Sequence, residues 1–148
     1  MPGDIGRYAA LLERIENAVF LGPELLRNPQ FGAGITGGWT TGAGWAAAGS
    51  ILTATTVATA LQQSATSSIF VVGNVYRVSY QIITRTAGNV RFQFTGGTND
   101  NATARDSVGV WNEDITITQT ITSVRMINGG TAFSGTLCNI SVREVLSI

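Results

Sequence analysis

Carboxylates are the side chains of this 148-residue chain best suited to catalysis, because the sequence contains no histidine. Asp106, Glu113 and Asp114 lie close together in the sequence. Two carboxylates that flank a glycosidic bond can cleave it, one as the acid and the other as base or nucleophile. The alternative is that these three are solvated at the ends of strands. That alternative is favoured, and the sequence predicts a protein that is not an enzyme and has no catalytic residue.

Nucleophilic catalysis is equally poorly supported, because a serine or cysteine nucleophile needs a base and no histidine is present. The single cysteine, Cys138, alternates with Ile140 and Val142. This alternation predicts that Cys138 lies on the buried face of a strand, where a thiol is inert. One cysteine also excludes an intrachain disulfide framework and a cysteine-rich zinc site.

The segment "TNDNATARD", residues 98–106, carries oxygen ligands that could surround a cation. It lacks the glycine and the closing glutamate of an EF-hand loop, so it is more typical of a polar turn. The glycines of "FTGGT", residues 94–98, do not match a phosphate-binding motif. We therefore predict no metal site and no cofactor.

Three tryptophans, Trp39, Trp45 and Trp111, are candidates for a glycan-binding platform. Exposed aromatic rings can stack on sugars, whereas large aromatic side chains more often fill cores. We expect at least two of the three to lie in the core.

Charge and hydropathy exclude other partners. The nine acidic residues balance nine basic ones, all of them arginine, with no basic cluster. Nucleic acid and anionic lipid both attract clustered positive charge, so neither is an expected partner. No apolar run has the length of a membrane span or of a signal peptide, which predicts a soluble protein made in a cytoplasm.

Residues 4–21 predict an amphipathic helix. Asp4 can cap it, and Gly22-Pro23 can end it. Its apolar positions have heptad spacing, and the stripe consists of Ile5, Tyr8, Leu12, Ile15 and Val19. The stripe packs either on the chain's own domain or on copies and partners. The second alternative predicts a homo-oligomer, most simply a trimer, and Gly22 to Asn28 would be the joint.

From residue 25 onward the apolar pattern has period two, which is typical of strands. The clearest segments are "VYRVSYQII", "VRFQF", "ITITQTI" and "SVRMI". "TAGN" and "NGG" supply hairpin turns. Eight to ten such strands with glycine-rich turns predict an all-β antiparallel sandwich, with the helix appended.

Four motifs in order resemble a domain of bacteriophage virion proteins: "LLRNPQF", "GWTTGAGW", "VGNVYRVSY" and "FSGTLCNISVREV". This domain is a carbohydrate-binding-module-like jelly roll found in tail, fibre and capsid-decorating proteins. The resemblance covers roughly residues 25–146 and implies a jelly-roll-like β-sandwich over 25–148 behind a helical arm and joint at 1–24. The motifs themselves predict that Asn28 and Phe31 start the first strand and plug one end of the core, and that the last strand returns to pair near the first.

The resemblance also implies a role. We expect a capsid decoration or cement protein that binds other virion proteins, assembled in the host cytoplasm and located in the virion. The alternative is a tail or fibre component, acting as a structural adaptor or a glycan-binding receptor module. Related modules hold a structural calcium through acidic residues at two positions that are Gly32 and Cys138 in this sequence. The resemblance therefore implies that this calcium is lost.

Overall fold

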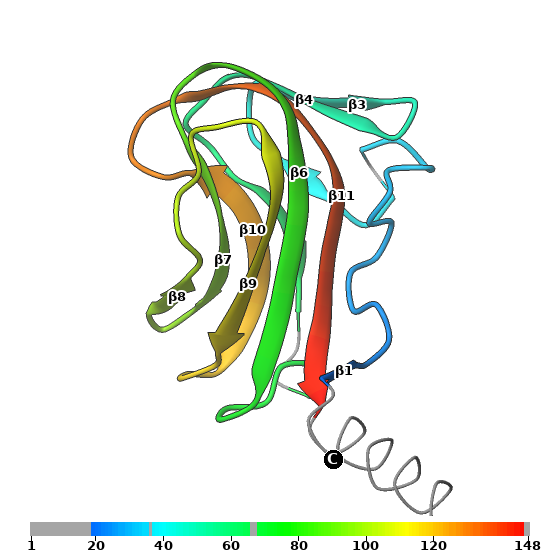
Figure 1. Cartoon of the computed structure of the whole chain (residues 1–148), viewed down its shortest axis with the longest axis vertical. Helices are drawn as coiled ribbons and strands as arrows, with labels where there is room; N and C mark the ends of the chain where they lie inside the picture. The colour runs from blue at the N-terminus through cyan, green and yellow to red at the C-terminus, as the bar shows by residue number, and fades with distance from the viewer. Residues whose placement is uncertain (1–18, 36, 66–67, 147–148) are drawn as a thin grey trace, which may run out of the picture.

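The computed structural model describes residues 19–35, 37–65 and 68–146, which form two packed antiparallel sheets (Figure 1). The first sheet has the order β3 (Trp45–Ala48), β4 (Ile51–Val57), β11 (Phe133–Leu146), β6 (Val75–Ala87) and β9 (Gly109–Thr116), and β1 (Phe20–Leu21) pairs with β11. The second sheet has the order β2 (Thr40–Thr41), β5 (Leu61–Ser64), β10 (Ile121–Asn128), β7 (Val90–Gly96) and β8 (Asn99–Asn101). The predicted all-β antiparallel sandwich is confirmed.

The period-two pattern becomes the core. In β6 the residues Tyr76, Val78, Tyr80 and Ile82 are all buried, as the alternation predicts. The inward residues of β7 and β10 face them from the second sheet. Those residues are Val90, Phe92, Phe94, Val124 and Met126. Fully burying each large apolar side chain stabilises the fold by roughly 1.5–3 kcal/mol, so these two strand faces fix which side of each sheet turns inward.

The hairpin between β6 and β7 is tight, as the sequence "TAGN" predicts. Gly88 has a φ of 69°, which a residue with a side chain rarely adopts. A Cβ at this position would lie 1.9 Å from the carbonyl oxygen of Ala132. Only glycine therefore fits between the hairpin and the segment that leads into β11.

Phe31 lies in the core but not in a strand. Its side chain is buried and stacks on Trp39 with ring centroids 5.5 Å apart. Its backbone has a φ of 56°, and its N–H donates to the carbonyl oxygen of Asn28 at 3.1 Å. The prediction that Phe31 plugs the core is confirmed, whereas the prediction that Asn28 and Phe31 start the first strand is wrong because this turn replaces it.

Cys138 lies on the outward face of β11, so its predicted burial beside Ile140 and Val142 is wrong. The cause is a β-bulge. Cys138 pairs with Gln81 and Ser141 pairs with Ser79, so between these two pairs β11 advances by three residues and β6 by two. Asn139, with a φ of 54°, is the extra residue. The bulge reverses the alternation, and Leu137 rather than Cys138 is buried.

The predicted helix over residues 4–21 falls mostly outside the described residues. Of its apolar stripe, Ile5, Tyr8, Leu12 and Ile15 lie outside them, and Val19 is exposed. Phe20 and Leu21 form β1, so a helix cannot extend to residue 21. No helix of the described residues has the length and apolar character to cross a bilayer.

The segment after β1 is fastened to β11. The N–H of Gly22 donates to the carbonyl oxygen of Glu144 at 2.9 Å, and that of Leu25 to Val142 at 3.0 Å. These bonds place the predicted joint along the edge of the first sheet. The last strand, β11, pairs with β1 (Figure 1), but β1 lies within the residues predicted as helix and is not the first strand predicted to begin at Asn28 and Phe31. The boundary between an arm at 1–24 and a sandwich at 25–148 stays a prediction.

Candidate functional site

The outer face of the first sheet carries an open polar groove. The cross-strand register aligns Ser141, Ser79 and Asn112 across β11, β6 and β9. Because side chains alternate along a strand, these three point away from the buried Val78 and Val142. The groove has a volume of about 410 Å³ and is lined by Leu21, Glu24, Gln30, Arg77, Ser79, Asn112, Asn139, Ser141 and Arg143.

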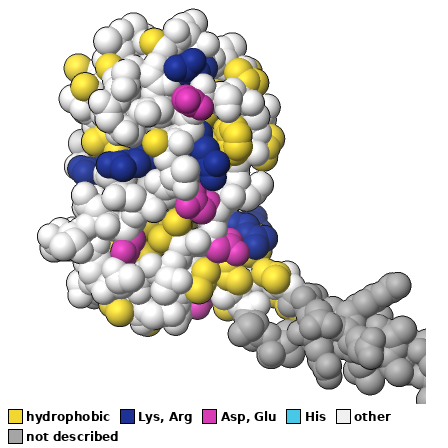
Figure 2. All heavy atoms as spheres, turned by 60° about the vertical axis from the view of Figure 1, so that its left-hand side comes forward, with side chains coloured by type: hydrophobic (Ala, Val, Ile, Leu, Met, Phe, Trp, Pro, Cys, Tyr) yellow, Lys and Arg dark blue, Asp and Glu magenta, His cyan; other side chains and the backbone are white. Residues whose placement is uncertain are grey.

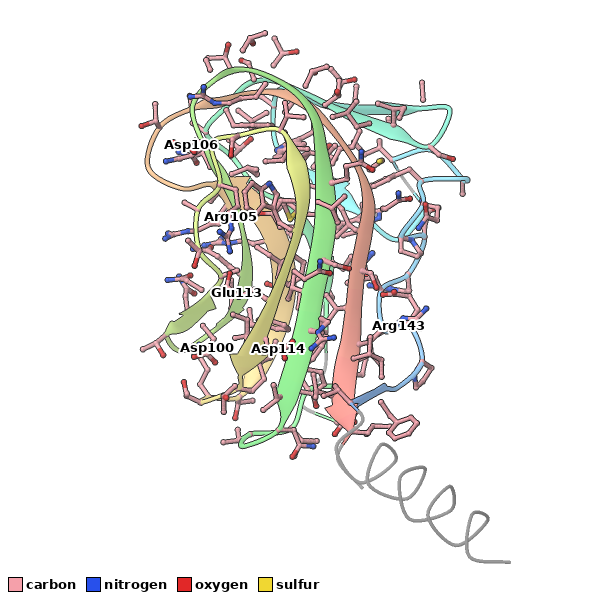
Figure 3. The ribbon with its side chains drawn as sticks, viewed as in Figure 1. Asp100, Arg105, Asp106, Glu113, Asp114 and Arg143 are labelled. Atoms are coloured by element: carbon pink, nitrogen blue, oxygen red, sulfur yellow. The ribbon has the colours of Figure 1, made fainter. Side chains whose placement is uncertain are left out.

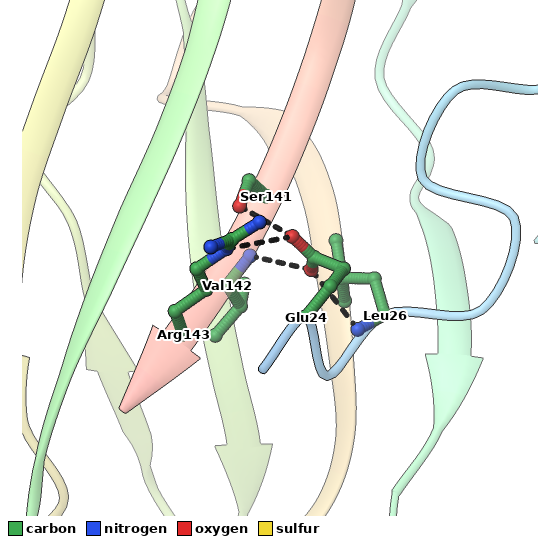
Figure 4. Close-up of polar contacts among 5 residues, drawn as sticks. All are labelled: Glu24, Leu26, Ser141, Val142 and Arg143. Carbon is green, nitrogen blue, oxygen red and sulfur yellow. Dashed lines mark hydrogen bonds and ion pairs between the residues drawn. The ribbon is translucent and has the colours of Figure 1, made fainter. Parts of the chain in front are cut away.

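One wall of the groove is built by Glu24 (Figure 4). Its Oε1 accepts hydrogen bonds from the backbone N–H of Val142 at 2.9 Å and of Leu26 at 3.1 Å. Its Oε2 accepts a bond from the hydroxyl of Ser141 and lies 3.8 Å from Nε of Arg143. One carboxylate thus ties the N-terminal segment to β11 and fixes two side chains that line the groove.

The outward row next to Ser141, Ser79 and Asn112 is charged: Arg143 of β11 aligns with Arg77 of β6, and Arg77 forms an ion pair with Asp114 of β9. Nε of Arg77 lies 2.7 Å from Oδ1, and Nη2 lies 2.9 Å from Oδ2, which is the bidentate geometry of a guanidinium on a carboxylate. The hydrogen bonds from Arg77 lower the pKa of the Asp114 carboxyl, and the same contact raises the pKa of Arg77. Both groups are therefore charged and oriented at neutral pH.

The groove floor beside this charged row is polar, and three of its side chains are unpaired among the described residues. Within the described part of the chain, the side chains of Ser79, Asn112 and Asn139 have no hydrogen-bond partner in the protein. A hydroxyl and two amides offer both donors and acceptors. Such a floor suits a ligand that carries many hydroxyl groups, with orientation supplied by the charged row beside it.

The carboxylates considered for catalysis are held apart by structural contacts. Glu113 accepts hydrogen bonds from the N–H and hydroxyl of Thr103 at 2.8 and 3.0 Å and pairs with Arg105 at 3.5 Å. Asp114, its neighbour in β9, points to the other face of the sheet. Asp106 lies toward the other end of the molecule from Asp114 (Figure 3). The structure does not bring these three together.

The tryptophans are mostly core residues. Trp39 and Trp45 are buried, and their indole N–H groups donate to the carbonyl oxygens of Asn28 and Thr59, each at 3.0 Å. The expectation that at least two of the three fill the core is confirmed. Trp111 is partly exposed, and the guanidinium of Arg105 lies 4.6 Å from its ring centroid. Trp111 alone stays a candidate platform, and it lies outside the groove.

The oxygen-rich segment 98–106 takes part in structural hydrogen bonds. The Asp100 carboxylate accepts bonds from the N–H and hydroxyl of Thr118, at 2.9 and 2.6 Å. No group of three or more acidic, cysteine or histidine residues gathers as metal ligands in the described residues. Gly32 is exposed, with nothing near its Cα that a side chain would touch, and Cys138 contributes only a thiol, 3.5 Å from Oε1 of Gln81. Neither position supplies the carboxylate that a calcium ion prefers.

Sequence reasoning missed Glu24, which it placed in a joint. The signal for it is weak, because its partners at 141–143 are more than a hundred positions away in the chain. It also missed Asn112 and Asn139, which look like ordinary strand and turn residues in the sequence.

No protein-family model and no curated protein matches the sequence. Solved structures do match its fold. One is the CBM22-1 xylan-binding domain of Paenibacillus barcinonensis Xyn10C, with a TM-score of 0.57, 17% identity, and coverage of 86% of this chain and 97% of that domain. The shared feature is the fold.

Other matches are carbohydrate-binding modules of family 29. A mutant of CBM29-2 gives a TM-score of 0.55 at 10% identity, over 86% of both chains. Another family 29 module gives 0.54 at 10% identity, over 86% of this chain and 89% of that one. The chain thus has the sandwich fold of carbohydrate-binding modules, and at these identities the likeness concerns architecture alone. The comparisons carry no sign of a bacteriophage origin.

Proposed function

We propose that the protein is a non-catalytic glycan-binding module that holds a sugar chain in the groove on the outer face of the first sheet. The observation that carries the proposal is the groove's floor. Among the described residues, Ser79, Asn112 and Asn139 have unpaired polar groups, and the ion pairs Arg77–Asp114 and Glu24–Arg143 lie in the row beside Ser79 and Asn112. The fold of carbohydrate-binding modules supports it, because one matching structure is named as xylan-binding.

The binding mode follows from the side chains present. Trp39 and Trp45 are buried, so within the described residues the groove holds no aromatic ring for stacking. Hydrogen bonds and ordered water would therefore carry recognition, and affinity would be modest because each net hydrogen bond contributes only about 0.5–1.5 kcal/mol. The width of the groove across β11, β6 and β9 favours a polysaccharide over a single sugar.

The test is affinity electrophoresis in gels that contain soluble xylan or a soluble cellulose derivative, together with calorimetry on cellohexaose. The variant is Ser79→Ala with Asn112→Ala, which removes the floor without breaking any protein hydrogen bond. Thr120→Ala, an exposed residue on the loop between β9 and β10, is the matched control. We expect the double variant to bind about tenfold more weakly and the control to bind like the wild type.

The proposal fails if the wild type binds no neutral polysaccharide, or if the double variant binds as tightly as the wild type. Retained fold is checked by the melting temperature of each variant. Cleavage of the polysaccharide during incubation would contradict the non-catalytic part of the proposal.

A second candidate function is the virion building block expected from the sequence. The observation that favours it is an apolar end of the sandwich where β1 meets β11, at which Phe20, Leu21 and Leu146 are exposed. Exposed apolar patches of this kind often mark protein interfaces. Light scattering on the purified chain tests it. A monomer at micromolar concentration would contradict the homotrimer, and localisation in purified virions would be needed to support the role.

A further inference from the structure

The outer face of the second sheet carries a continuous row of polar side chains. The register aligns Thr40, Gln62, Arg125, Gln93 and Asn101 across β2, β5, β10, β7 and β8. With neighbouring strands about 4.8 Å apart, four steps give a row roughly 19 Å long. The row therefore spans the whole sheet, on the side of the molecule opposite the groove.

The row lies on the outer face of the sheet because its neighbours in sequence point inward, and of its members Gln93 is only 2% exposed. Leu61, Phe92 and Met126 lie one position away from row members and are fully buried. Apart from Ile127, the other outward residues of β5, β10, β7 and β8 are serine, threonine, asparagine, glutamine or arginine. A strand face with a single large apolar residue is not shaped to pack on another protein core.

Two arginines give this face its charge. Nε of Arg125 donates to Oε1 of Gln93 at 2.6 Å, which orients the guanidinium and leaves its two Nη groups for other partners. Arg91 lies on the same face, one strand away, and its Nε is buried without a hydrogen-bond partner among the described residues. An orphaned buried donor of this kind is costly unless a ligand satisfies it.

No carboxylate of the described residues pairs with these two arginines. All ion pairs among the described residues involve Arg77, Arg105 or Arg143. The outward positions of the second sheet include no aspartate or glutamate, since Asp100 of β8 turns its carboxylate to Thr118. At the left of Figure 2, basic side chains lie next to each other without an acidic one between them. The face therefore attracts anions.

The types of side chain on this face indicate which class of anionic polymer fits it. Nucleic acid sites combine many positive charges with aromatic rings for the bases, and this face has two arginines and no aromatic residue among its described outward positions. The side chains of Thr40, Gln62 and Asn101, which are exposed or half-buried along this row, offer hydroxyl and amide groups to a polymer of hydroxyls. A guanidinium accepts a planar carboxylate through two parallel hydrogen bonds.

We propose that the outer face of the second sheet is a binding site for an acidic polysaccharide, with Arg91 and Arg125 on its carboxylate or sulfate groups and Thr40, Gln62 and Asn101 along its hydroxyls. This site does not depend on the groove of the first sheet. It differs from the groove in position, charge and expected ligand.

The test uses the full chain in affinity gels that contain polygalacturonate, dextran sulfate or uncharged dextran. We expect retardation by one or both charged polymers and none by dextran, with retardation decreasing as salt rises. Polygalacturonate and dextran sulfate distinguish carboxylate from sulfate recognition. Arg91→Gln with Arg125→Gln should weaken binding at least about tenfold, because each arginine offers charge-assisted bonds.

Arg85→Gln is the matched control, because it removes the same charge from the β6–β7 hairpin, where Arg85 only donates to the carbonyl oxygen of Gly88. Its binding should match the wild type. In the double variant, loss of the Arg125–Gln93 hydrogen bond could harm folding. The single variant Arg91→Gln breaks no hydrogen bond among the described residues, so it tests the site independently of that contact. The proposal is overturned if no charged polymer retards the protein, if Arg91→Gln has no effect, or if single-stranded DNA is bound equally well.

Discussion

Replacing Glu24 with alanine should destabilise the sandwich strongly, although the residue lies outside every regular strand. The substitution leaves the N–H groups of Leu26 and Val142 and the hydroxyl of Ser141 without their acceptor. A hydrogen bond to a charged group contributes about 1.5–3 kcal/mol. The side chain of Glu24 is 22% exposed, so water replaces part of this loss, and we expect a total of about 3 kcal/mol.

For a domain of this size, 1 kcal/mol shifts the melting temperature by about 2–4 °C, so the melting temperature should fall by roughly 6–12 °C. Scanning calorimetry measures this, and urea unfolding gives the free energy independently. Glu24→Gln is the informative partner variant. Its amide oxygen still accepts from both backbone N–H groups, whereas its amide nitrogen loses the ion pair with Arg143 and can only donate to the Ser141 hydroxyl, so it should cost about 1 kcal/mol. A Glu24→Ala protein that melts within 1 °C of the wild type would refute the assigned role.

Three further predictions concern single contacts. Asp114 has a lowered pKa in the folded state, so its pair with Arg77 stabilises the protein above about pH 4, and this stabilisation is lost below it. In urea unfolding, the free energy of unfolding of Asp114→Asn should therefore fall less between pH 5 and pH 3 than that of the wild type, by no more than about 1 kcal/mol. Burial raises the pKa of the Cys138 thiol, so Cys138 should be alkylated more slowly than free cysteine at pH 8, as measured by mass spectrometry. An equal rate would contradict the partial burial of this thiol. Gly88→Ala should cost about 2–4 kcal/mol in urea unfolding, whereas Gly97→Ala, where a Cβ meets open space, should cost less than about 1 kcal/mol; equal effects would refute the steric argument.

The fold could be predicted from the sequence wherever alternation persists without interruption. Tyr76, Val78, Tyr80 and Ile82 keep strict period two through β6, and burial of that face in a sandwich follows directly from strand geometry. The β6–β7 turn was equally predictable, because "TAGN" contains the glycine that the positive φ of residue 88 requires.

Two features could not be predicted from pattern alone. Cys138 points outward because a bulge at Asn139 adds one residue to β11, and the local sequence pattern does not predict this bulge. The groove depends on Glu24 meeting Ser141 and Val142, which are 117 and 118 positions away. Periodicity reports which face a residue takes, whereas contacts between distant segments follow from the strand order of the whole sheet.

The most direct test of the central claim is a nuclear magnetic resonance titration of the nitrogen-15-labelled protein with cellohexaose and with xylohexaose. Side-chain amide signals of Asn112 and Asn139 report on the groove, and those of Asn99 and Asn101 report on the opposite sheet. We predict that one or both sugars shift the Asn112 and Asn139 signals and the Nε signal of Arg77, and leave Asn99 and Asn101 unchanged. Unchanged spectra at millimolar sugar, or shifts confined to the second sheet, would contradict the groove as a glycan site.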